Sequence, residues 1–406
     1  MPPDSAPPES LPLDGLRVLD LTRLLPGGYA TQMLADLGAD VLKIEEPGAG
    51  DYARAMPPLL RGVGESFLAT NRNKRSAAIN LKHARGRDVL LRLVDGADVL
   101  IESFRPGVMA RLGLAHETLR ERNPRLIVCA ISGYGQEGPY SQRVGHDLNY
   151  IGYAGLLAHL TPPGQPPTLP GAQFADIAGG SLMAIVGILA ALAGRTSTGR
   201  GRVVDVSMTE GTLALLPWLA SNMLNGAPEP EPGSGWLAGA LPGYNVYECA
   251  DGKYVTLAAL EPKFWAEFCR RVDRPDLIER QYPRDAADRH KTQSALAAIF
   301  RTRTRDEWID ALGDADICFG PVNSLEEALA DPQARARGVS KRVSYGDEHD
   351  IGALRIAPLM SETPFSVRRG LPALGEHTAE ALTEAGFTSE EITELADAGA
   401  VALPRR

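Results

Sequence analysis

The sequence predicts an α/β protein built from two domains. Strand-like and helix-like segments alternate along the first third of the chain, a pattern typical of a parallel sheet covered by helices. The chain has 406 residues, more than one hydrophobic core usually supports. Residues 225–243 are rich in Gly, Pro and Glu and show little periodicity, which indicates a linker. We therefore expect a doubly wound, Rossmann-like parallel sheet in a large domain, and a smaller α+β domain.

A first βαβ unit is predicted within residues 16–45. The apolar run over residues 16–21 is typical of a short buried strand, a helical pattern follows Pro26-Gly27-Gly28, and residues 41–45 form a second strand. Further strands of the same sheet are expected at residues 77–81, 98–102, 126–131 and 203–207, with an amphipathic helix over residues 84–94. No GxGxxG motif follows the first strand, so the nicotinamide or flavin fingerprint is missing.

An uncharged run over residues 177–194 reaches the length of a membrane span. Its Gly and Ala content, and the charged, strand-like segment after it, favour instead a helix buried inside a protein core. Beyond the linker, residues 244–249 and 254–257 flank Asp251-Gly252, a pair favoured in type I′ hairpin turns. Helix starts with capping-box patterns are predicted at Thr304, Ser324 and Thr388.

The predicted organisation has five parts. They are a disordered tail (1–10), a large domain (11–224), the linker (225–243), a small domain (244–330) and a return segment with a C-terminal helix (331–406). The return segment has too little apolar surface for a core of its own, so we expect it to pack on the large domain. The tail lacks the basic and apolar regions of a signal peptide.

Charge and cysteine content exclude several classes of function. A net charge of −9 argues against a general nucleic-acid binder, which normally has a basic excess. The four cysteines are scattered without metal-ligand spacing, which predicts free thiols in a reducing compartment and no metal site. We expect a cytoplasmic protein that binds neither membranes nor nucleic acid. The common hydrolase, kinase, P-loop and zinc-peptidase motifs are missing as well.

A local excess of positive charge lies between Asn71 and Arg111. This stretch contains nine Lys or Arg residues and four Asp or Glu residues. On an acidic protein such a zone suggests an anionic ligand. The alternative, a solvated helix face, accounts for Arg85, Arg87 and Arg92.

Two titratable residues, His146 and Asp176, stand directly ahead of apolar helical runs. At a helix N-terminus the free N–H groups and the dipole favour developing negative charge. Two proton carriers beside such a surface suit an enzyme that removes and returns a carbon-bound proton. The alternatives are a structural histidine and an ordinary N-cap, and spacing alone favours the N-cap for Asp176. Burial would raise the pKa of this carboxylate and the dipole would lower it, so the sequence leaves the balance open.

A third acidic residue, Glu261, precedes Pro262 in an apolar context. One interpretation is a strand-end charge that faces water. The other is a partner that orients a histidine across a cleft. Both interpretations remain open.

Eight stretches follow one another in a highly specific series. They are residues 13–21, 36–45, 73–76, 104–108, 138–140, 199–208, 320–323 and 374–378. By these stretches nearly the whole chain resembles the family III CoA-transferases (the CaiB/BaiF-like superfamily) and their relatives, the α-methylacyl-CoA racemases. Gly145-His146-Asp147 favours the racemase branch. The transferases resemble the chain at Asp176, their acyl-accepting nucleophile, but typically lack the histidine.

The resemblance implies a racemase that interconverts (R)- and (S)-2-methylacyl-CoA thioesters through an enolate. His146 and Asp176 would face the two sides of the α-carbon, and Glu261 would support the histidine. The enolate oxygen would be held by helix N-terminal N–H groups, including that of Asp147. No cofactor or metal would be required, and CoA would enter as part of the substrate.

CoA carries three phosphates, so cations are expected around it. The positions that match the family's CoA contacts are Lys82, Ser103, Phe104, Arg105, Arg111 and Arg143, although Phe104 also fits a core position. Family members often have arginine where this chain has Glu46, beside the expected adenine site, so nucleotide contacts there must differ. The resemblance further implies an interlocked homodimer whose active sites are completed across subunits.

Two rival functions remain open. The first is transfer of CoA between carboxylic acids through a covalent Asp176 intermediate. The second is a non-catalytic acyl-CoA-binding protein, which predicts CoA binding without exchange of the α-proton. The sequence does not identify the acyl group, because fatty, steroid-side-chain and aryl-propionyl thioesters all fit.

Overall fold

The structure, a computed structural model, describes residues 10–162, 164–345 and 349–404. Most of the predicted tail (1–10) therefore lies outside the described residues. The chain divides into two compact units, and the second comprises Leu157–Pro170 and Trp218–Ala336. The first unit contains the chain before Leu157, Gly171–Pro217 and the chain from Arg337 onward. The predicted domain boundaries stay predictions.

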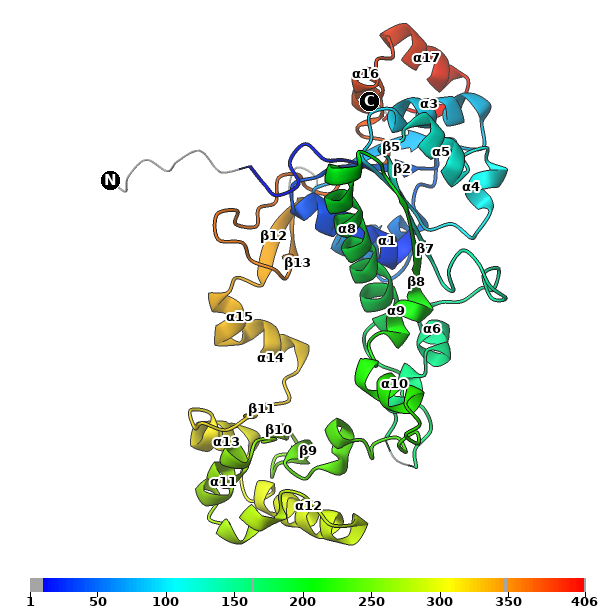
Figure 1. Cartoon of the computed structure of the whole chain (residues 1–406). Coiled ribbons are helices and arrows are strands. Elements are labelled where there is room, and N and C mark those ends of the chain that lie inside the picture. Colours follow the sequence, from blue (N-terminus) through cyan, green and yellow to red (C-terminus); the bar gives the residue numbers. More distant parts are fainter. Residues whose placement is uncertain (1–9, 163, 346–348, 405–406) are drawn as a thin grey trace. The chain divides into compact units, whose positions relative to one another are not determined.

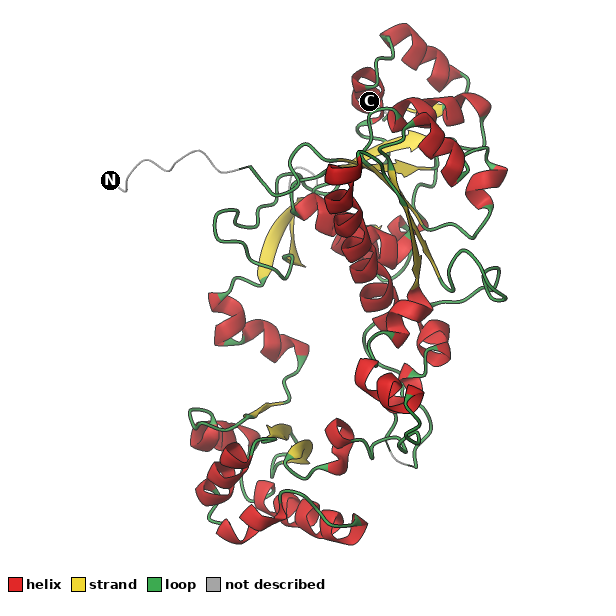
Figure 2. Cartoon of the chain, in the orientation of Figure 1, coloured by secondary structure: helices red, strands yellow, loops and turns green. Residues whose placement is uncertain are grey.

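The first unit is built on a seven-stranded sheet (Figures 1 and 2). Its strands are β1 (Arg17–Leu21), β2 (Asp40–Glu45), β5 (Arg75–Ile79), β6 (Val99–Glu102), β7 (Ile127–Ser132), β8 (Val203–Ser207) and β14 (Val401–Ala402). All pairs are parallel except that of β14, which runs antiparallel to β5. The predicted α/β class with a mostly parallel sheet is therefore confirmed.

The order of the strands predicts where a ligand binds. The sheet runs β14-β5-β2-β1-β6-β7-β8, so the parallel strands, counted along the chain, follow the order 3-2-1-4-5-6 of dinucleotide-binding folds. The order reverses between β1 and β6, which pair in parallel with Val18 opposite Val99. Folds of this type bind ligands beyond the carboxyl ends of the strands at this reversal. We therefore expect a site just after Leu21 and Glu102.

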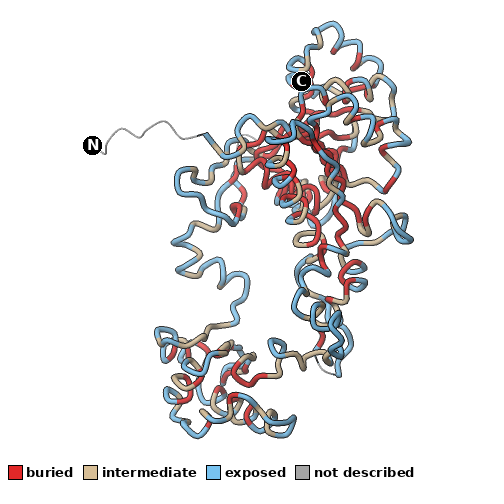
Figure 3. Tube along the Cα trace, viewed as in Figure 1, coloured by how far each residue is buried: buried red, intermediate tan, exposed pale blue. Residues whose placement is uncertain are grey.

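Burial follows the parallel arrangement. β5, β6 and β7 are buried along their whole length (Figure 3). Strands covered on both faces are expected to be mostly apolar, and β6 and β7 are apolar except for their last residues, Glu102 and Ser132, which accept hydrogen bonds from Phe104 and Gly135. In β5 the first two residues, Arg75 and Ser76, are polar but hydrogen-bonded.

Helices connect and cover the strands of the first unit. They are α1 (Leu24–Asp36), η1 (Tyr52–Arg54), α2 (Glu65–Thr70), α3 (Ala84–Val94), α4 (Val108–Arg111), α5 (His116–Arg122), α6 (Asp147–Tyr153), η2 (Ala175–Leu182), α8 (Met183–Thr198), α9 (Met208–Leu213), α16 (Thr378–Glu384) and α17 (Ser389–Asp397). Two small hairpins, β3 (Leu59–Leu60) with β4 (Val63–Gly64) and β12 (Ser340–Tyr345) with β13 (His349–Leu354), complete it.

Two predicted boundaries were wrong by a few residues. The strand expected at residues 77–81 begins at Arg75, because Arg75 and Ser76 find polar partners inside the fold. The first helix begins at Leu24 and includes the Pro-Gly-Gly segment. Proline is tolerated there because the first turn of a helix needs no N–H from it.

The long apolar segment is helical from Ala175 to Thr198, π-helical in η2 and α-helical in α8. By length and composition alone it could cross a membrane, and 39% of its most apolar window is buried. One face packs against α1, β7 and β8. Leu182, Val186 and Leu189 are exposed on the single chain. The expectation of a buried core helix is therefore correct for one face only.

The second unit combines helices with a three-stranded antiparallel sheet, in the order β11-β10-β9. Its elements are α7 (Leu156–His159, which starts at the unit boundary), α10 (Pro217–Leu224), η3 (Trp236–Ala240), β9 (Tyr244–Glu248), β10 (Tyr254–Ala258), α11 (Pro262–Arg271), η4 (Pro275–Arg280), α12 (Ala286–Phe300), α13 (Arg305–Leu312), β11 (Phe319–Pro321), α14 (Leu325–Ala330) and α15 (Pro332–Ala336). The predicted hairpin is confirmed, and Thr304, Ser324 and Thr388 all form capping boxes.

Candidate active site

A large cavity of the first unit lies where the strand order predicts a ligand. It has a volume of about 840 Å³ and is lined by residues that follow β1, β6 and β8 and by the end of β7. Six of the residues singled out in the sequence line it, namely Ser103, Phe104, Arg105, Arg143, His146 and Asp176. This volume lies within the range typical of small-molecule sites. We therefore take this cavity as the candidate active site.

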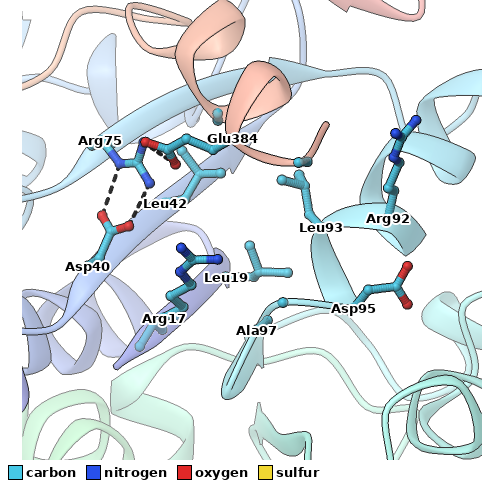
Figure 4. Close-up of a pocket in the computed structure, with 14 residues that line it drawn as sticks. Arg17, Leu19, Asp40, Leu42, Arg75, Arg92, Leu93, Asp95, Ala97 and Glu384 are labelled. Carbon is cyan, nitrogen blue, oxygen red and sulfur yellow. Dashed lines mark hydrogen bonds and ion pairs between the residues drawn. The ribbon is translucent and has the colours of Figure 1, made fainter. Parts of the chain in front are cut away.

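A second cavity, of about 390 Å³, lies at the opposite end of the strands, where β1, β2 and β5 begin (Figure 4). It is lined by Arg17, Asp40 and Arg75, the first residues of β1, β2 and β5. The Arg75 guanidinium there is already paired with Asp40 and Glu384, at 2.6 and 3.0 Å. None of the predicted catalytic residues lines this cavity, so it is not a competing active site.

The remaining predicted residues are distributed as follows. Lys82 and Phe104 line a smaller cavity of about 260 Å³ that shares Arg23 with the large one. Arg111 ends α4, is exposed and lines neither cavity. Glu261 is the exposed N-cap of α11 in the second unit, and its side chain makes no capping hydrogen bond.

His146 is held at the start of α6 by its neighbours. It is the N-cap residue, and its N–H donates to Asn149 Oδ1 at 3.0 Å. The Tyr150 hydroxyl donates to the carbonyl of Gly145 at 2.5 Å. A Cβ on Gly145 would lie 2.7 Å from the Tyr150 ring, so only glycine allows this contact. The imidazole itself remains exposed at the cavity.

Asp176 lies in the first turn of η2, a π-helical segment, and such segments occur often at functional sites. Its carbonyl accepts from Ser181 Oγ at 3.1 Å, and the same hydroxyl lies 2.6 Å from the carbonyl of Pro26. η2 approaches α9 so closely that a Cβ on Gly179 would meet the Met208 carbonyl at 2.4 Å. These contacts fix the backbone that carries the carboxyl group.

The N-cap alternative for Asp176 is wrong. The N-cap position of η2 belongs to Phe174, whose side chain cannot cap. The cap comes instead from Asp147, whose Oδ1 accepts from the N–H groups of Ala175 and Asp176 at 2.7 and 3.0 Å. Spacing could not show this, because the capping carboxylate is distant in the sequence.

The environment of Asp176 decides the balance that the sequence left open. Burial, and then the charge of the neighbouring Asp147, raise its pKa from 3.8 to about 7. A carboxyl group with such a pKa can both hold and release a proton near neutral pH. Functional sites are often marked by shifts of this kind.

The loop after β6 is held by a strand-end carboxylate. Glu102 accepts from the Phe104 N–H at 2.7 Å through one oxygen, and its other oxygen lies 3.1 Å from His116 Nε2. Ser103 Oγ accepts from the Arg23 N–H at 3.1 Å, which joins this loop to the one after β1. The rigid loop presents Ser103, Phe104 and Arg105 to the cavity.

Sequence reasoning missed Arg23 and Tyr150, which also line the large cavity. The Arg23 guanidinium lies 5.6 Å from the centre of the Phe104 ring. Its position two residues after the first strand could have identified it, because loops at the reversal of strand order bind ligands. Tyr150 carries no comparable signal, since its role depends on the contacts with Gly133 and Gly145.

Glu46 lies at the smaller cavity, between two cations. It accepts from Lys82 Nζ at 2.6 Å, and its other oxygen is 3.9 Å from Arg23. The hydrogen bond from Lys82 lowers the pKa of Glu46. A nucleotide phosphate that approached Lys82 or Arg23 would compete with this carboxylate.

Known proteins resemble the chain over most of its length. The sequence model of CoA-transferase family III matches residues 13–378. The alpha-methylacyl-CoA racemase of Mus musculus is 38% identical over 387 residues, which cover 94% of this chain and 96% of that protein. The succinyl-CoA:glutarate CoA-transferase of Homo sapiens is 33% identical over 396 residues, covering 96% and 90%. A crystal structure of a CAIB/BAIF family protein from Brucella suis has a TM-score of 0.79 at 31% identity, covering 93% of this chain and 100% of that one.

Proposed function

The chain belongs to CoA-transferase family III, whose members act on CoA thioesters, and from this premise we propose that it is a 2-methylacyl-CoA racemase. The observation that carries the proposal is that His146 and Asp176 line one cavity at the reversal of strand order. Racemisation needs two groups that exchange protons with one carbon, and this cavity offers an imidazole and a carboxyl group. The raised pKa of Asp176 suits a group that must arrive protonated in one direction.

The proposed reaction is a 1,1-proton transfer. In one direction neutral His146 removes the α-proton, and the electrons of the C–H bond form the enolate while the thioester oxygen becomes negative. Protonated Asp176 then gives its proton to the opposite face of the carbon, and the enolate electrons form the new C–H bond. The reverse direction exchanges the roles. The product is the opposite enantiomer, and no redox partner is required.

The developing enolate oxygen needs hydrogen-bond donors. We propose the backbone N–H of Asp147 as one of them. As the first helical residue of α6, Asp147 has an N–H without an intrahelical acceptor. Such donors, together with the helix dipole, stabilise negative charge that forms only in the transition state.

The CoA portion is proposed to extend over the basic loops. Arg105 and Arg143 line the large cavity, and Lys82 lines the smaller one. The Arg143 guanidinium lies 3.7 Å from the centre of the Tyr140 ring and donates to Tyr153 Oη at 2.7 Å. It is therefore preordered for an anionic group. Guanidinium and ammonium groups are the usual partners of phosphate.

Two further parts of the proposal concern Glu261 and assembly. We propose that Glu261 orients His146 and that the protein is a homodimer. The exposed apolar residues Leu182, Val186 and Leu189 are consistent with a face that a second copy covers. Sedimentation of the purified protein at micromolar concentration tests the dimer, and a monomer would contradict it.

The proposed role of Glu261 is tested by Glu261→Gln. This variant should slow the exchange of the α-proton without lowering the affinity for CoA.

The test is incubation of one enantiomer of a 2-methylacyl-CoA in D₂O without an acceptor acid. We expect deuterium at the α-carbon and loss of optical purity. His146→Ala and Asp176→Asn should each lower the rate by roughly 10²–10⁴-fold, the usual contribution of a general acid or base. His290→Ala, an exposed histidine of the second unit, serves as the matched control. An unchanged rate of α-deuterium uptake in both site variants would refute the assignment of His146 and Asp176 as the two bases.

CoA transfer between carboxylic acids is the second candidate, favoured by the transferase that is 33% identical over nearly the whole chain. It requires Asp176 to attack the thioester carbonyl as a carboxylate, with CoA leaving as the thiolate and a mixed anhydride remaining on Asp176. Hydroxylamine added during turnover would convert that anhydride into a hydroxamate detectable by mass spectrometry. If a hydroxamate forms at Asp176, and if turnover of the CoA thioester requires an acceptor acid, CoA transfer replaces racemisation as the proposed function.

A further inference from the structure

The Asp147 carboxylate forms a bridge between the two segments that carry the proposed bases. Its Oδ1 accepts from the N–H groups of Ala175 and Asp176, at 2.7 and 3.0 Å. The first N–H groups of a helix have no acceptors within it, and in η2 the cap residue Phe174 offers none. Asp147 therefore supplies from α6 the cap that η2 lacks.

The bridge ties together two backbones that matter for the chemistry. His146 directly precedes the capping residue, and Asp176 is itself one of the two capped residues. A shift of η2 relative to α6 would break the bonds of 2.7 and 3.0 Å before it separated the two side chains by much. The same carboxylate thus restricts the positions of both His146 and Asp176.

The bridge also places a negative charge beside the Asp176 carboxyl group. Two carboxyl groups in close proximity resist double ionisation. Burial and the Asp147 charge both act to raise the pKa of Asp176. The other ionisable groups around the cavity are Arg23, Tyr52, Arg105, Arg143, His146 and Tyr150, and Glu210 lies on α9, which packs against η2. Within the described ranges, none of these cations forms an ion pair with Asp176.

We propose that Asp147 is a positioning residue, whose carboxylate holds η2 against α6 and strengthens proton binding by Asp176 in the free enzyme. This inference deepens the proposed racemase function and rests on it. It assigns the side chain of Asp147 a task separate from that of its backbone N–H. Removing the charge should therefore change the proton affinity of Asp176 even where the hydrogen bonds survive.

The test compares Asp147→Asn with Asp147→Ala. The asparagine oxygen can still accept both N–H groups, whereas alanine removes bonds and charge together. We expect the apparent pKa of Asp176 to fall by about one unit in Asp147→Asn, since a neighbouring like charge has been removed. The readout is the ¹³Cγ titration of labelled aspartate, with the Asp176 resonance assigned from its absence in Asp176→Asn. The pH profile for α-deuterium uptake should move in the same direction.

Asp205→Asn is the matched control. Asp205 also uses a carboxylate oxygen to accept a distant N–H, that of Gln136 at 3.0 Å, but it caps no candidate base. It should leave the Asp176 titration unchanged. An unchanged Asp176 pKa in Asp147→Asn, with any loss of thermal stability, would reduce Asp147 to a structural cap and overturn the inference.

The titration does not depend on turnover. If the protein proves to be a transferase, the Asp176 pKa still answers whether Asp147 controls that proton. If racemisation is found but the pKa does not move, only the role of Asp147 is refuted. Asp147→Ala should lower the rate of α-deuterium uptake more than Asp147→Asn does, because alanine also removes the two hydrogen bonds to η2. Equal rates in the two variants would contradict the positioning part of the inference.

Discussion

Asp20 is fully buried and Asp176 is half-buried beside a cavity, and their surroundings shift the two pKa values in opposite directions. Burial opposes ionisation of Asp20, but Lys43 and Lys74 overcome it and lower the pKa to about 2. Asp176 has burial and the Asp147 charge acting together, which raise its pKa to about 7. Burial alone therefore does not decide the outcome. The number and sign of charged neighbours separate a structural carboxylate from one suited to proton transfer.

The two regions also differ in how completely their polar groups are satisfied. Asp20 accepts from Thr22 and Thr31 at 2.6 Å and pairs with Lys74 at 3.2 Å, while Lys43 pairs with Asp51 at 2.9 Å. All of this lies inside the fold. Within the part of the chain that the structure describes, no hydrogen bond holds the Asp176 carboxyl oxygens. A free carboxyl group beside a cavity is available to substrate, whereas Asp20 is not.

The largest effect is expected for Lys74→Met, which removes one of the two lysines that lower the pKa of Asp20. It leaves Asp20 with an incompletely compensated buried charge, and breaking such a pair typically costs about 3–5 kcal/mol of unfolding free energy. Lys82→Met is the control, because Lys82 is 76% exposed and its pair with Glu46 contributes about 0–1 kcal/mol. Urea denaturation followed by hydrogen exchange in β1 and β5 measures both. Equal effects would contradict the structural role of the network.

The four tryptophans offer an internal reference for that experiment. Trp218, Trp236, Trp265 and Trp308 all belong to the second unit, whereas Lys74 belongs to the first. Tryptophan fluorescence therefore reports the second unit, and hydrogen exchange in the strands reports the first.

The comparison is sharpened by the pH dependence of Asp176→Asn. Below about pH 4 Asp176 is protonated in both folded and unfolded chains. Between about pH 4 and the folded pKa of about 7 only the folded chain keeps the proton, so stability falls as pH rises. Replacing Asp176 with asparagine should therefore stabilise the protein by about 4 kcal/mol more at pH 8 than at pH 4, since each unit of difference between the folded and unfolded pKa contributes about 1.4 kcal/mol. Thermal denaturation at both pH values checks this, and a pH-independent difference would refute the raised pKa.

Asp20→Asn should show the opposite pH dependence. Because the folded pKa is lowered to about 2, Asp20 contributes stability above about pH 4 and loses it as pH falls toward 2. The loss of unfolding free energy caused by Asp20→Asn should therefore become smaller as the pH falls from about 4 to about 2. If this loss does not change with pH, the missing hydrogen bonds cause it, and the missing charge does not.

The smallest expected effect concerns Glu46, which like Asp20 has two cations nearby but is 39% exposed. Glu46→Gln should change the unfolding free energy by less than about 1 kcal/mol, because exposed ion pairs contribute little. It should instead tighten CoA binding about two- to five-fold by releasing Lys82 and Arg23 for phosphate. Calorimetric titration with CoA measures this, and weaker binding would show that Glu46 itself contacts the nucleotide.

Much of the fold was predictable from local patterns. The β8 strand and the α3 helix lie at the predicted residues, and three capping boxes were correctly placed, because these signals depend on neighbours within one turn. His146 and Asp176 were identified as candidates, and they do line one cavity.

The details that long-range contacts decide were not predictable. The cap of η2 comes from Asp147, whose position relative to Ala175 depends on packing between α6 and η2. The exposed face of α8 could not be distinguished from its buried face, because both are apolar. The pKa of Asp176 depends on which charges approach it in space, and spacing along the chain does not encode that.

The pairing of β14 with β5 has a consequence for how the protein is made. Val401 and Ala402 hydrogen-bond to the edge of a sheet whose first strand begins at Arg17. During translation that edge stays open until Val401 and Ala402 emerge from the ribosome, after the whole second unit has been synthesised. Nascent chains should thus depend on protection of an unpaired strand edge, and truncation before Val401 should favour aggregation.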